Sequence, residues 1–335
     1  MKAVIKSIAP YLPKNILTNE MLAGEFPEWP VDKILNKIGI RERRISGDET
    51  ITGMAVNAAN KLFESSLLNP KDVDYILLCS QSPDYILPTS ACIIQHELGI
   101  PSSAGAIDFN QGCSGYIYGL SLAKGLIAGQ IAKNILLITS EAYSKHLHSQ
   151  DKSNRAIFGD AATATWIGTG SGLEIENFIL GTDGKGANNL IINNGGSRFP
   201  KDEGKSYFDS DGNMRHDNFL YMNGSEIFNF TLESIPALVN ETLKSNKLRF
   251  EEVNWFVFHQ ANTFMLKHLR KKIGIQVEKF PIEMEFTGNT VSSTIPLVLE
   301  KFLSQNKIKT EDILMLTGFG VGYSWGSVIV KYNNY

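Results

Sequence analysis

Two stretches of this chain, KDVDYILLCSQSPDY (71–85) and EEVNWFVFHQANTFM (251–265), share one layout. Each begins with an acidic turn, continues into a short apolar run and ends in a polar step toward an amphipathic segment. Apolar runs of this length are typical of strands that are buried on both faces of a parallel sheet. Val73 and Val253 correspond at an offset of 253 − 73 = 180 residues, which indicates an internal repeat.

Three further pairs of short motifs recur at nearly the same offset. They are ELGI (97–100) with KIGI (272–275), GCS (112–114) with GNT (288–290), and ILLIT (135–139) with ILMLT (313–317), at offsets of 175, 176 and 178 residues. Four landmarks at a nearly constant offset predict two similar α/β halves, 1–172 and 173–335, each alternating strand, helix, strand, helix and strand. We expect equivalent points of the two halves to meet and to form a shared site.

The composition is that of an ordinary folded protein, with 335 residues of which 43% are hydrophobic and 20% are charged. A net charge of −3 gives no overall attraction to nucleic acid or to an anionic membrane, so neither is an expected partner. No apolar run reaches the roughly 18 residues of a membrane helix. The N-terminus lacks a signal-peptide core, so a cytoplasmic protein is expected. The three cysteines form no CxxC pair, so neither a disulfide framework nor a structural zinc site is expected.

The stretch FNQGCSGYIYGL (109–120) places Cys113 where an apolar strand gives way to a helical pattern. Unpaired N–H groups and the positive end of a helix dipole favour a thiolate there, so Cys113 is a candidate nucleophile. The neighbouring glycines permit a tight turn and the close approach of another backbone or a ligand. The alternative is that Cys113 is a small buried apolar residue, as is expected of Cys79 and Cys92.

His259 and Asn289 occupy the equivalent strand ends of the second half. His259 ends the run WFVF at the position of Cys79, and Asn289 in GNT matches Cys113. Ligands of open α/β sheets bind at the carboxyl ends of the strands, so the sequence predicts a Cys/His/Asn site. Taken singly, His259 is also compatible with a core histidine, and Asn289 with a helix N-cap. The other histidines are expected at the surface: His96, His146, His148, His216 and His268.

Six motifs follow one another along the chain. They are GIRERRI (39–45), GCSGYIYGLSLA (112–123), IFGDAATA (157–164), HQAN (259–262), GNT…IP (288–296) and GFGVGYSWG (318–326). Together they resemble the β-ketoacyl-acyl-carrier-protein synthase III family. The resemblance implies a thiolase-like fold, in which duplicated α/β halves form a five-layer αβαβα architecture, and a homodimer. It also implies that Cys113 is the nucleophile and that His259 and Asn289 complete the catalytic set.

The same resemblance implies a reaction. An acyl-CoA acylates Cys113, and a decarboxylative Claisen condensation with malonyl-carrier protein then gives 3-oxoacyl-carrier protein, CoA and CO2, in fatty acid or related biosynthesis. His259 and Asn289 donate to the malonyl thioester oxygen, while the N–H of Cys113 and one from Gly320 or Val321 hold the second oxyanion. The expected partners are acyl-CoA and an acyl carrier protein. No metal and no cofactor beyond the CoA thioester substrate is expected.

The resemblance also assigns substrate-binding positions. Leu87, in PDYILPTSAC (83–92), is expected to reach the acyl pocket of the second subunit and to limit chain length. Lys152 is expected to contact a CoA phosphate, whereas Phe264 stands where the family often has a basic residue. Val321 interrupts the family's glycine run, and because a β-branched residue resists positive φ, a reshaped loop is expected.

Lys271 and Lys272 follow His259 on one helix and have two interpretations. One is a solvated basic face, and the other, which the resemblance favours, is docking of an acidic carrier protein.

The function also has alternatives. A synthase III-like acyltransferase would pass the acyl group to a hydroxyl or amine acceptor in a specialised pathway. A papain-like protease has the same order of Cys and His, but its local signature is missing. A non-catalytic partner subunit is disfavoured because all three site residues are present.

Overall fold

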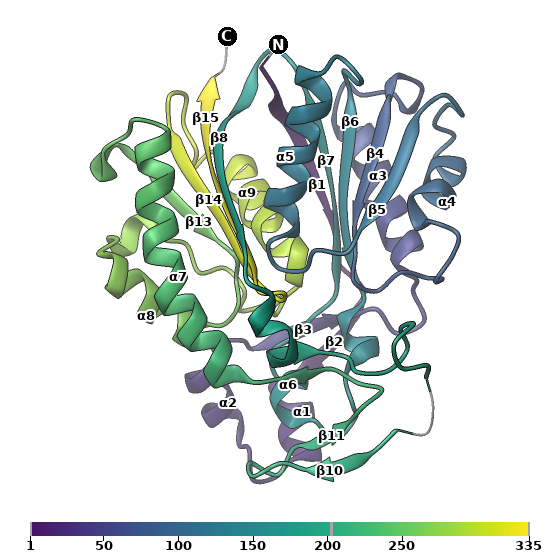
Figure 1. The fold of residues 1–335 in the computed structure, drawn as a ribbon, viewed down its shortest axis with the longest axis vertical. Helices are drawn as coiled ribbons and strands as arrows, with labels where there is room; N and C mark the ends of the chain where they lie inside the picture. Colours follow the sequence, from purple (N-terminus) through teal and green to yellow (C-terminus); the bar gives the residue numbers. More distant parts are fainter. Residues whose placement is uncertain (1, 202–203, 334–335) are drawn as a thin grey trace.

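The computed structural model describes residues 2–201 and 204–333 (Figure 1). The first half contains β1 (Val4–Tyr11), α3 (Ile51–Ser65), β4 (Tyr75–Cys79), α4 (Ser90–Glu97), β5 (Gly105–Phe109), α5 (Gly115–Ala128), β6 (Ile135–Glu141) and β7 (Ala161–Gly168). The second contains β8 (Gly172–Thr182), α7 (Gly224–Ser245), β13 (Trp255–Phe258), α8 (Thr263–Ile273), α9 (Thr294–Ser304), β14 (Ile313–Gly320) and β15 (Ser324–Asn333). Apart from the strand between α4 and α5, the order of these elements repeats between the halves.

The strands of both halves join in one mixed sheet of nine strands within the described residues, in the order β13-β14-β15-β8-β1-β7-β6-β4-β5. The pairs β4·β5, β4·β6 and β13·β14 are parallel, and the other pairs are antiparallel. The halves meet through a short pairing of β1 with β8, at Val4 with Glu174 and Ile5 with Leu173. Every residue of β6 is buried, which confirms the predicted burial of the ILLIT run on both faces.

Helices cover the sheet in layers. Figure 1 shows α5 and α9 between the two halves, α3 and α4 outside the first half, and α7 and α8 outside the second. The central layer is apolar because side chains such as Ile117 and Leu120 of α5 pack in one core with Ile295 and Leu299 of α9. The five-layer, thiolase-like architecture implied by the resemblance is therefore confirmed.

One predicted strand is absent from the described residues of the second half. The counterpart of β5 should fall just before GNT, but the segment from Pro281 to Gly288 is irregular. Its backbone is paired elsewhere: the carbonyl of Glu285 accepts from Arg41 N–H at 2.7 Å, and Glu283 N–H donates to the Gln260 side chain at 2.8 Å. These contacts replace strand pairing. The bond from Arg41 holds the segment against the residue that precedes β3 (Glu42–Ile45).

The remaining elements are not repeated between the halves, and Figure 1 shows most of them beyond one end of the sheet. They are β2 (Asn15–Thr18), α1 (Asn19–Glu25), α2 (Val31–Ile38), β3 (Glu42–Ile45), α6 (Lys152–Arg155), β9 (Leu190–Ile191), β10 (Ser206–Phe208), β11 (Met214–His216) and β12 (Tyr221–Met222). Short 3-10 turns include η2 (Tyr143–His146) and η6 (Val291–Ser293). Among the helices that the structure describes, none combines the length and the apolar composition that crossing a membrane requires.

Candidate active site

Cys113 lies between β5 and α5, and it is buried against the end of β14. Ser114 is the residue that caps α5, so the thiol precedes the helix by two positions. A Cβ atom added to Gly320 would lie 2.9 Å from Cys113 Cβ and 3.0 Å from Cys113 Sγ. Only glycine therefore leaves room for the thiol at this point of β14.

The thiol of Cys113 is neutral in the free protein. Burial and, to a smaller extent, the nearby Glu141 carboxylate raise its pKa to about 12, while the backbone N–H groups of Cys113 and Val321 act in the opposite direction. Burial therefore opposes the thiolate that a helix N-terminus favours. The two N–H groups nevertheless face the sulfur, as an oxyanion site requires.

The loop after β14 accommodates Val321 without left-handed backbone. Positive φ falls on the next residue, Gly322, at 133°, and Val321 is not among the positive-φ residues. Val321 therefore avoids the positive φ that a β-branched residue resists. Val321 instead packs closely: a Cβ added to Gly112 would lie 2.6 Å from Val321 Cγ1 and 2.5 Å from Gln81 Oε1.

His259 follows β13 and is almost fully buried. Its N–H donates to the carbonyl of Thr317 in β14 at 2.8 Å, and its Nδ1 lies 2.8 Å from Thr294 Oγ1. Burial lowers its pKa to about 3, so the imidazole is neutral, although the Val291 carbonyl acts in the opposite direction. Nε2 is buried and has no hydrogen-bond partner in the described structure. A satisfied core histidine would not leave this atom unpaired.

Asn289 is held on both sides of its backbone. Its N–H donates to Ile157 O at 2.9 Å, and its carbonyl accepts from Gly159 N–H at 3.0 Å. Its Oδ1 accepts from Val291 N–H at 2.9 Å, two residues on, which is a local turn rather than an α-helix N-cap. Among the described residues, no hydrogen bond is recorded for Nδ2. A donor on Asn289 and an unpaired nitrogen on His259 are thus both available to a substrate.

Contacts between the halves bring the three predicted residues together. Cys113 packs on Gly320 and the backbone N–H of His259 donates to Thr317, so both residues lie at the carboxyl end of β14. Asn289 is linked to His259 through Val291, which accepts at its carbonyl and donates at its N–H. Val291 has φ +55°, a backbone that is rare for a β-branched residue and costs about 1–3 kcal/mol. Such strain is typical of a constrained functional site.

Sequence reasoning missed a buried carboxyl group, Glu141, at the end of β6. Its Oε1 accepts from Ser292 Oγ at 2.7 Å and its Oε2 from Gln81 N–H at 3.0 Å. Burial raises its pKa to about 8. The carboxylate lies close enough to Cys113 to raise the pKa of that thiol. One signal was available: an acidic residue directly follows the apolar run ILLITS.

The assigned substrate and docking residues lie outside this cluster. Lys152 is buried, with Nζ 2.9 Å from the Glu28 carboxylate. Phe264 is exposed and packs against His268 with ring centroids 4.2 Å apart. Leu87 is 79% exposed. Lys271 and Lys272 are exposed on α8.

Four predictions of burial or exposure are wrong, for one cysteine and three histidines. Cys92 is exposed, because it lies on the face of α4 opposite the buried Ala91 and Ile94. His146 is half-buried: η2 turns its ring inward, and Nε2 lies 3.2 Å from the Gln81 carbonyl oxygen. His148 and His216 are also half-buried, whereas His96 and His268 are exposed as predicted.

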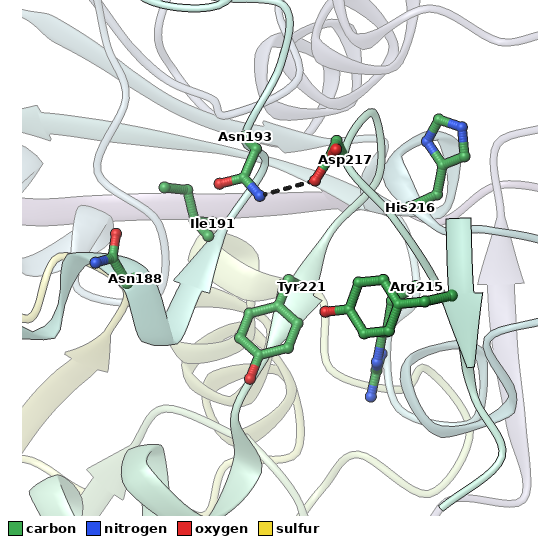
Figure 2. Close-up of a pocket in the computed structure, with 8 residues that line it drawn as sticks. Asn188, Ile191, Asn193, Arg215, His216, Asp217 and Tyr221 are labelled. Carbon is green, nitrogen blue, oxygen red and sulfur yellow. Dashed lines mark hydrogen bonds between the residues drawn. The ribbon is translucent and has the colours of Figure 1, made fainter. Parts of the chain in front are cut away.

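A cavity of about 190 Å³ lies apart from this site (Figure 2). None of the predicted site residues lines it. Its lining consists of Asn188, Ile191, Asn193, Tyr207, Arg215, His216, Asp217 and Tyr221. Arg215 is already paired with Asp151 and Asp209, and Asn193 donates to Asp217 at 3.2 Å. Because Asp151 also caps α6, this cluster supports the position of Lys152 rather than forming a reactive site.

Family models match two parts of the chain. Residues 107–184 match 3-oxoacyl-[acyl-carrier-protein (ACP)] synthase III, and residues 243–332 match the C-terminal model of the same family. A beta-ketoacyl-[acyl-carrier-protein] synthase III from Clostridium perfringens is 34% identical over 322 residues, which cover 96% of both chains.

Solved structures agree with this assignment. A crystal structure of a 3-oxoacyl-(acyl-carrier-protein) synthase III superposes with a TM-score of 0.97 at 50% identity, covering 99% of this chain and 100% of that one. A 3-oxoacyl-(acyl-carrier protein) synthase from Burkholderia xenovorans gives a TM-score of 0.91 at 36% identity, covering 99% and 95%. With the buried Cys113, His259 and Asn289 gathered at the end of β14, the chain belongs to the β-ketoacyl-[acyl-carrier-protein] synthase III family of condensing acyltransferases.

Proposed function

We propose that this enzyme uses Cys113 to carry an acyl group and His259 with Asn289 to drive a decarboxylative condensation. The first half, 1–172, then supplies the nucleophile, and the second, 173–335, supplies the two donors. The observation that carries the proposal is that a buried thiol, Cys113, shares the end of β14 with His259, whose buried Nε2 has no hydrogen-bond partner among the described residues. Leaving such atoms unpaired costs stability, so a ligand that satisfies them is the simplest reason for their retention.

Acylation is the first half-reaction. The sulfur of Cys113 attacks the carbonyl carbon of an acyl-CoA, and a new C–S bond forms as the bond to the CoA sulfur breaks. The thiol proton goes to the departing CoA sulfur, so CoA leaves as a thiol. The N–H groups of Cys113 and Val321, which already face the sulfur, stabilise the oxyanion of the tetrahedral intermediate. Gly320 leaves the room in which this intermediate forms.

Condensation is the second half-reaction. Malonyl-carrier protein binds with its thioester oxygen between His259 Nε2–H and the Asn289 amide, which stabilise the enolate as CO2 leaves. The nucleophilic carbon attacks the acyl-Cys113 carbonyl, and the thioester to Cys113 breaks. The Cys113 thiolate takes up a proton, which restores the thiol. The products are 3-oxoacyl-carrier protein and CO2, as in fatty acid or related biosynthesis. This chemistry requires neither a metal nor a redox cofactor.

Carrier docking is assigned to the exposed face of α8. Lys271 and Lys272 lie in its last turn, where basic residues suit the helix dipole and attract an acidic partner. Changing both to glutamate is expected to raise the KM for malonyl-carrier protein several-fold at low salt. Lys244→Glu, at the end of α7, is the matched control. Equal effects from the two sets of changes would contradict docking on α8.

For CoA, Lys152 is the proposed phosphate contact, and Phe264 is proposed as a second substrate-binding position. The ammonium of Lys152 is bonded to Glu28, which is exposed, so the phosphate must compete with this carboxylate. We expect Glu28→Gln to lower the KM for acyl-CoA and to leave the KM for malonyl-carrier protein unchanged. A parallel change in both constants would contradict the assignment.

A homodimer is proposed through the edge of the sheet. β5 is an edge strand, and an unpaired edge is a template for a second chain. Beside it, Tyr85, Ile86 and Leu87 are 60%, 93% and 79% exposed, which is unusual for neighbouring large apolar side chains. A second copy of the chain would cover them, and Leu87 would then limit the acyl group. Ile86→Asp should produce a monomer in light scattering. An unchanged molecular mass would contradict this interface.

A cytoplasmic location is also proposed. All three cysteines are free thiols, and free thiols are typical of proteins in reducing compartments.

Product analysis tests the proposed function directly. The enzyme is incubated with an acyl-CoA and malonyl-carrier protein, and CO2 and the mass of the carrier protein are followed. Formation of both CO2 and 3-oxoacyl-carrier protein is expected. Acylation of Cys113 without either product would contradict condensation and would favour transfer of the acyl group to a hydroxyl or an amine.

A further inference from the structure

The Nδ1 side of His259 faces two oxygen atoms of different chemistry. Thr294 Oγ1 lies 2.8 Å from Nδ1. The backbone of Val291 also interacts with the ring, and because Nε2 has no hydrogen-bond partner among the described residues, we assign this contact to Nδ1. The same Thr294 Oγ1 lies 3.0 Å from the Val291 carbonyl oxygen. The hydroxyl has a single proton, and it can donate this proton either to the carbonyl or to the ring nitrogen, but not to both.

The two directions in which the Thr294 hydroxyl can donate its proton require two different tautomers of His259. If Thr294 donates to Val291, Nδ1 must carry the proton and donate to the oxygens, so Nε2 has a lone pair. If Thr294 donates to Nδ1, then Nε2 carries the proton. A carbonyl can only accept, so Val291 alone permits the first arrangement but not the second. The hydroxyl of Thr294 is therefore the group that makes the Nε2–H tautomer of His259 available.

The reaction requires this second tautomer. An Nε2 lone pair would repel the oxygen of a developing enolate, whereas Nε2–H donates to it. We propose that Thr294 is a positioning residue that donates to Nδ1 of His259 and thereby holds Nε2–H ready for decarboxylation. This inference rests on the proposed function and adds to it the group that sets the donor.

The surrounding structure holds Thr294 and Val291 beside His259. Thr294 is buried at the first position of α9, and Val291 is held in its left-handed backbone by the side chain of Asn289. The two donors proposed for the malonyl oxygen are therefore coupled: Asn289 positions Val291, and Thr294 with Val291 determines the protonation of His259. Because Nε2 has no hydrogen-bond partner among the described residues, no such partner there favours one tautomer before substrate binds.

Three variants test the role of Thr294. Thr294→Val keeps the side-chain shape and removes the hydroxyl, and Thr294→Ser keeps the hydroxyl. Thr231→Val is the matched control, because Thr231 is also buried in a helix and its hydroxyl donates to a carbonyl, that of Ile227, at 2.8 Å. It has no histidine partner. For each variant, acylation by acetyl-CoA is followed by intact mass, and CO2 release from malonyl-carrier protein is followed separately.

The expected result is a split between the half-reactions. Thr294→Val should acylate within about threefold of the parent rate, whereas CO2 release should fall about 10²-fold, as on removal of one oxyanion donor. Thr294→Ser and Thr231→Val should keep both rates within about threefold. Equal loss of acylation and CO2 release in Thr294→Val would indicate a merely structural role and overturn the proposal. Unchanged CO2 release would overturn it too.

Nitrogen NMR gives a readout that is independent of activity. With 15N-labelled histidine, assigned by comparison with His259→Ala, the parent should show Nε2–H for His259, and Thr294→Val should show Nδ1–H. The same tautomer in both proteins would overturn the inference. Failure of the parent to form an acyl adduct or a condensation product would instead refute the proposed function, so the two failures are distinguishable.

Discussion

Cys79 and His259 occupy equivalent strand ends in the two halves, but only one of them is available for chemistry. The thiol of Cys79 donates to the Gln111 carbonyl at 2.8 Å, and burial raises its pKa well above the usual value. His259 directly follows β13 at the corresponding place and leaves Nε2 without a hydrogen-bond partner among the described residues. The duplicated fold thus provides two similar positions, and hydrogen-bond partners decide which one is structural and which one is reactive.

The two strand-to-helix turns differ in the same way. In the first half, α5 begins two residues after Cys113. In the second, Gly288 has φ +74° and a 3-10 turn, η6, separates Asn289 from α9. That extra turn brings Val291 and Thr294 to His259. The first half therefore presents a nucleophile at a helix start, and the second presents donors on a turn that supports a histidine.

The largest expected effect comes from changing the two strand ends. His259→Ala should lower the rate of condensation by about 10²–10⁴-fold and leave the rate of Cys113 acylation within about tenfold of the parent, because His259 donates to the enolate oxygen. Cys79→Ala should keep both rates within about threefold and lower the melting temperature, because it leaves a buried cavity. Separate assays of CO2 release and of acyl-enzyme mass check this. Loss of condensation in Cys79→Ala as large as in His259→Ala would break the comparison.

Next in size is the pH dependence of Cys113 alkylation. A thiol with a raised pKa of about 12 is protonated throughout the neutral range, and its thiolate fraction rises tenfold per pH unit below that value. Alkylation of Cys113 by iodoacetamide should therefore increase about 10²-fold from pH 7 to pH 9, as followed by peptide mass. A plateau reached below pH 9 would indicate a thiolate stabilised by α5.

A smaller effect is expected at the contact between the halves. In Gly320→Ala the new methyl group would lie about 3 Å from Cys113 Sγ, so acylation should fall by about tenfold or more. Gly125→Ala is the control, because the added Cβ meets nothing within 4 Å in α5, and it should stabilise the protein by about 0.5–1 kcal/mol. Acylation rates and thermal melting distinguish the two. Full activity of Gly320→Ala would contradict the tight fit.

The smallest expected effect concerns the ends of β6 and β14. Glu141 lies near Cys113, whereas at the equivalent place Phe319 packs edge-on against His259 with ring centroids 5.7 Å apart. Because the Glu141 carboxylate raises the pKa of Cys113, Glu141→Gln should lower that pKa and speed alkylation a few-fold at pH 9. Slower alkylation in this variant, measured in the same assay, would contradict the electrostatic assignment.

Much of this molecule follows from its sequence, for identifiable reasons. The repeat located Cys113, His259 and Asn289, because strand ends in a duplicated α/β unit converge. The roles of Glu141 and Thr294 did not follow, because they depend on contacts between distant segments, such as Glu141 with Ser292. The burial that raises the pKa of Cys113 did not follow either, because burial cannot be read from the start of a helix.

The absence of the predicted strand before GNT is also explained by contacts between distant segments. The segment from Pro281 is apolar and polar in alternation, but its backbone partners come from Arg41 and Gln260, which lie far away in the sequence or in another motif. Long-range pairing of this kind overrides a local pattern.

Intact mass after incubation with a panel of acyl-CoAs is the most direct test of Cys113 as the acyl carrier. We expect the parent and Cys79→Ala to gain one acyl group, which peptide mapping places on Cys113, and Cys113→Ala to gain none. The preferred acyl group would emerge from the same panel. An adduct of equal yield in Cys113→Ala, or none in the parent with any acyl donor, would contradict the assignment of Cys113 as the acyl carrier.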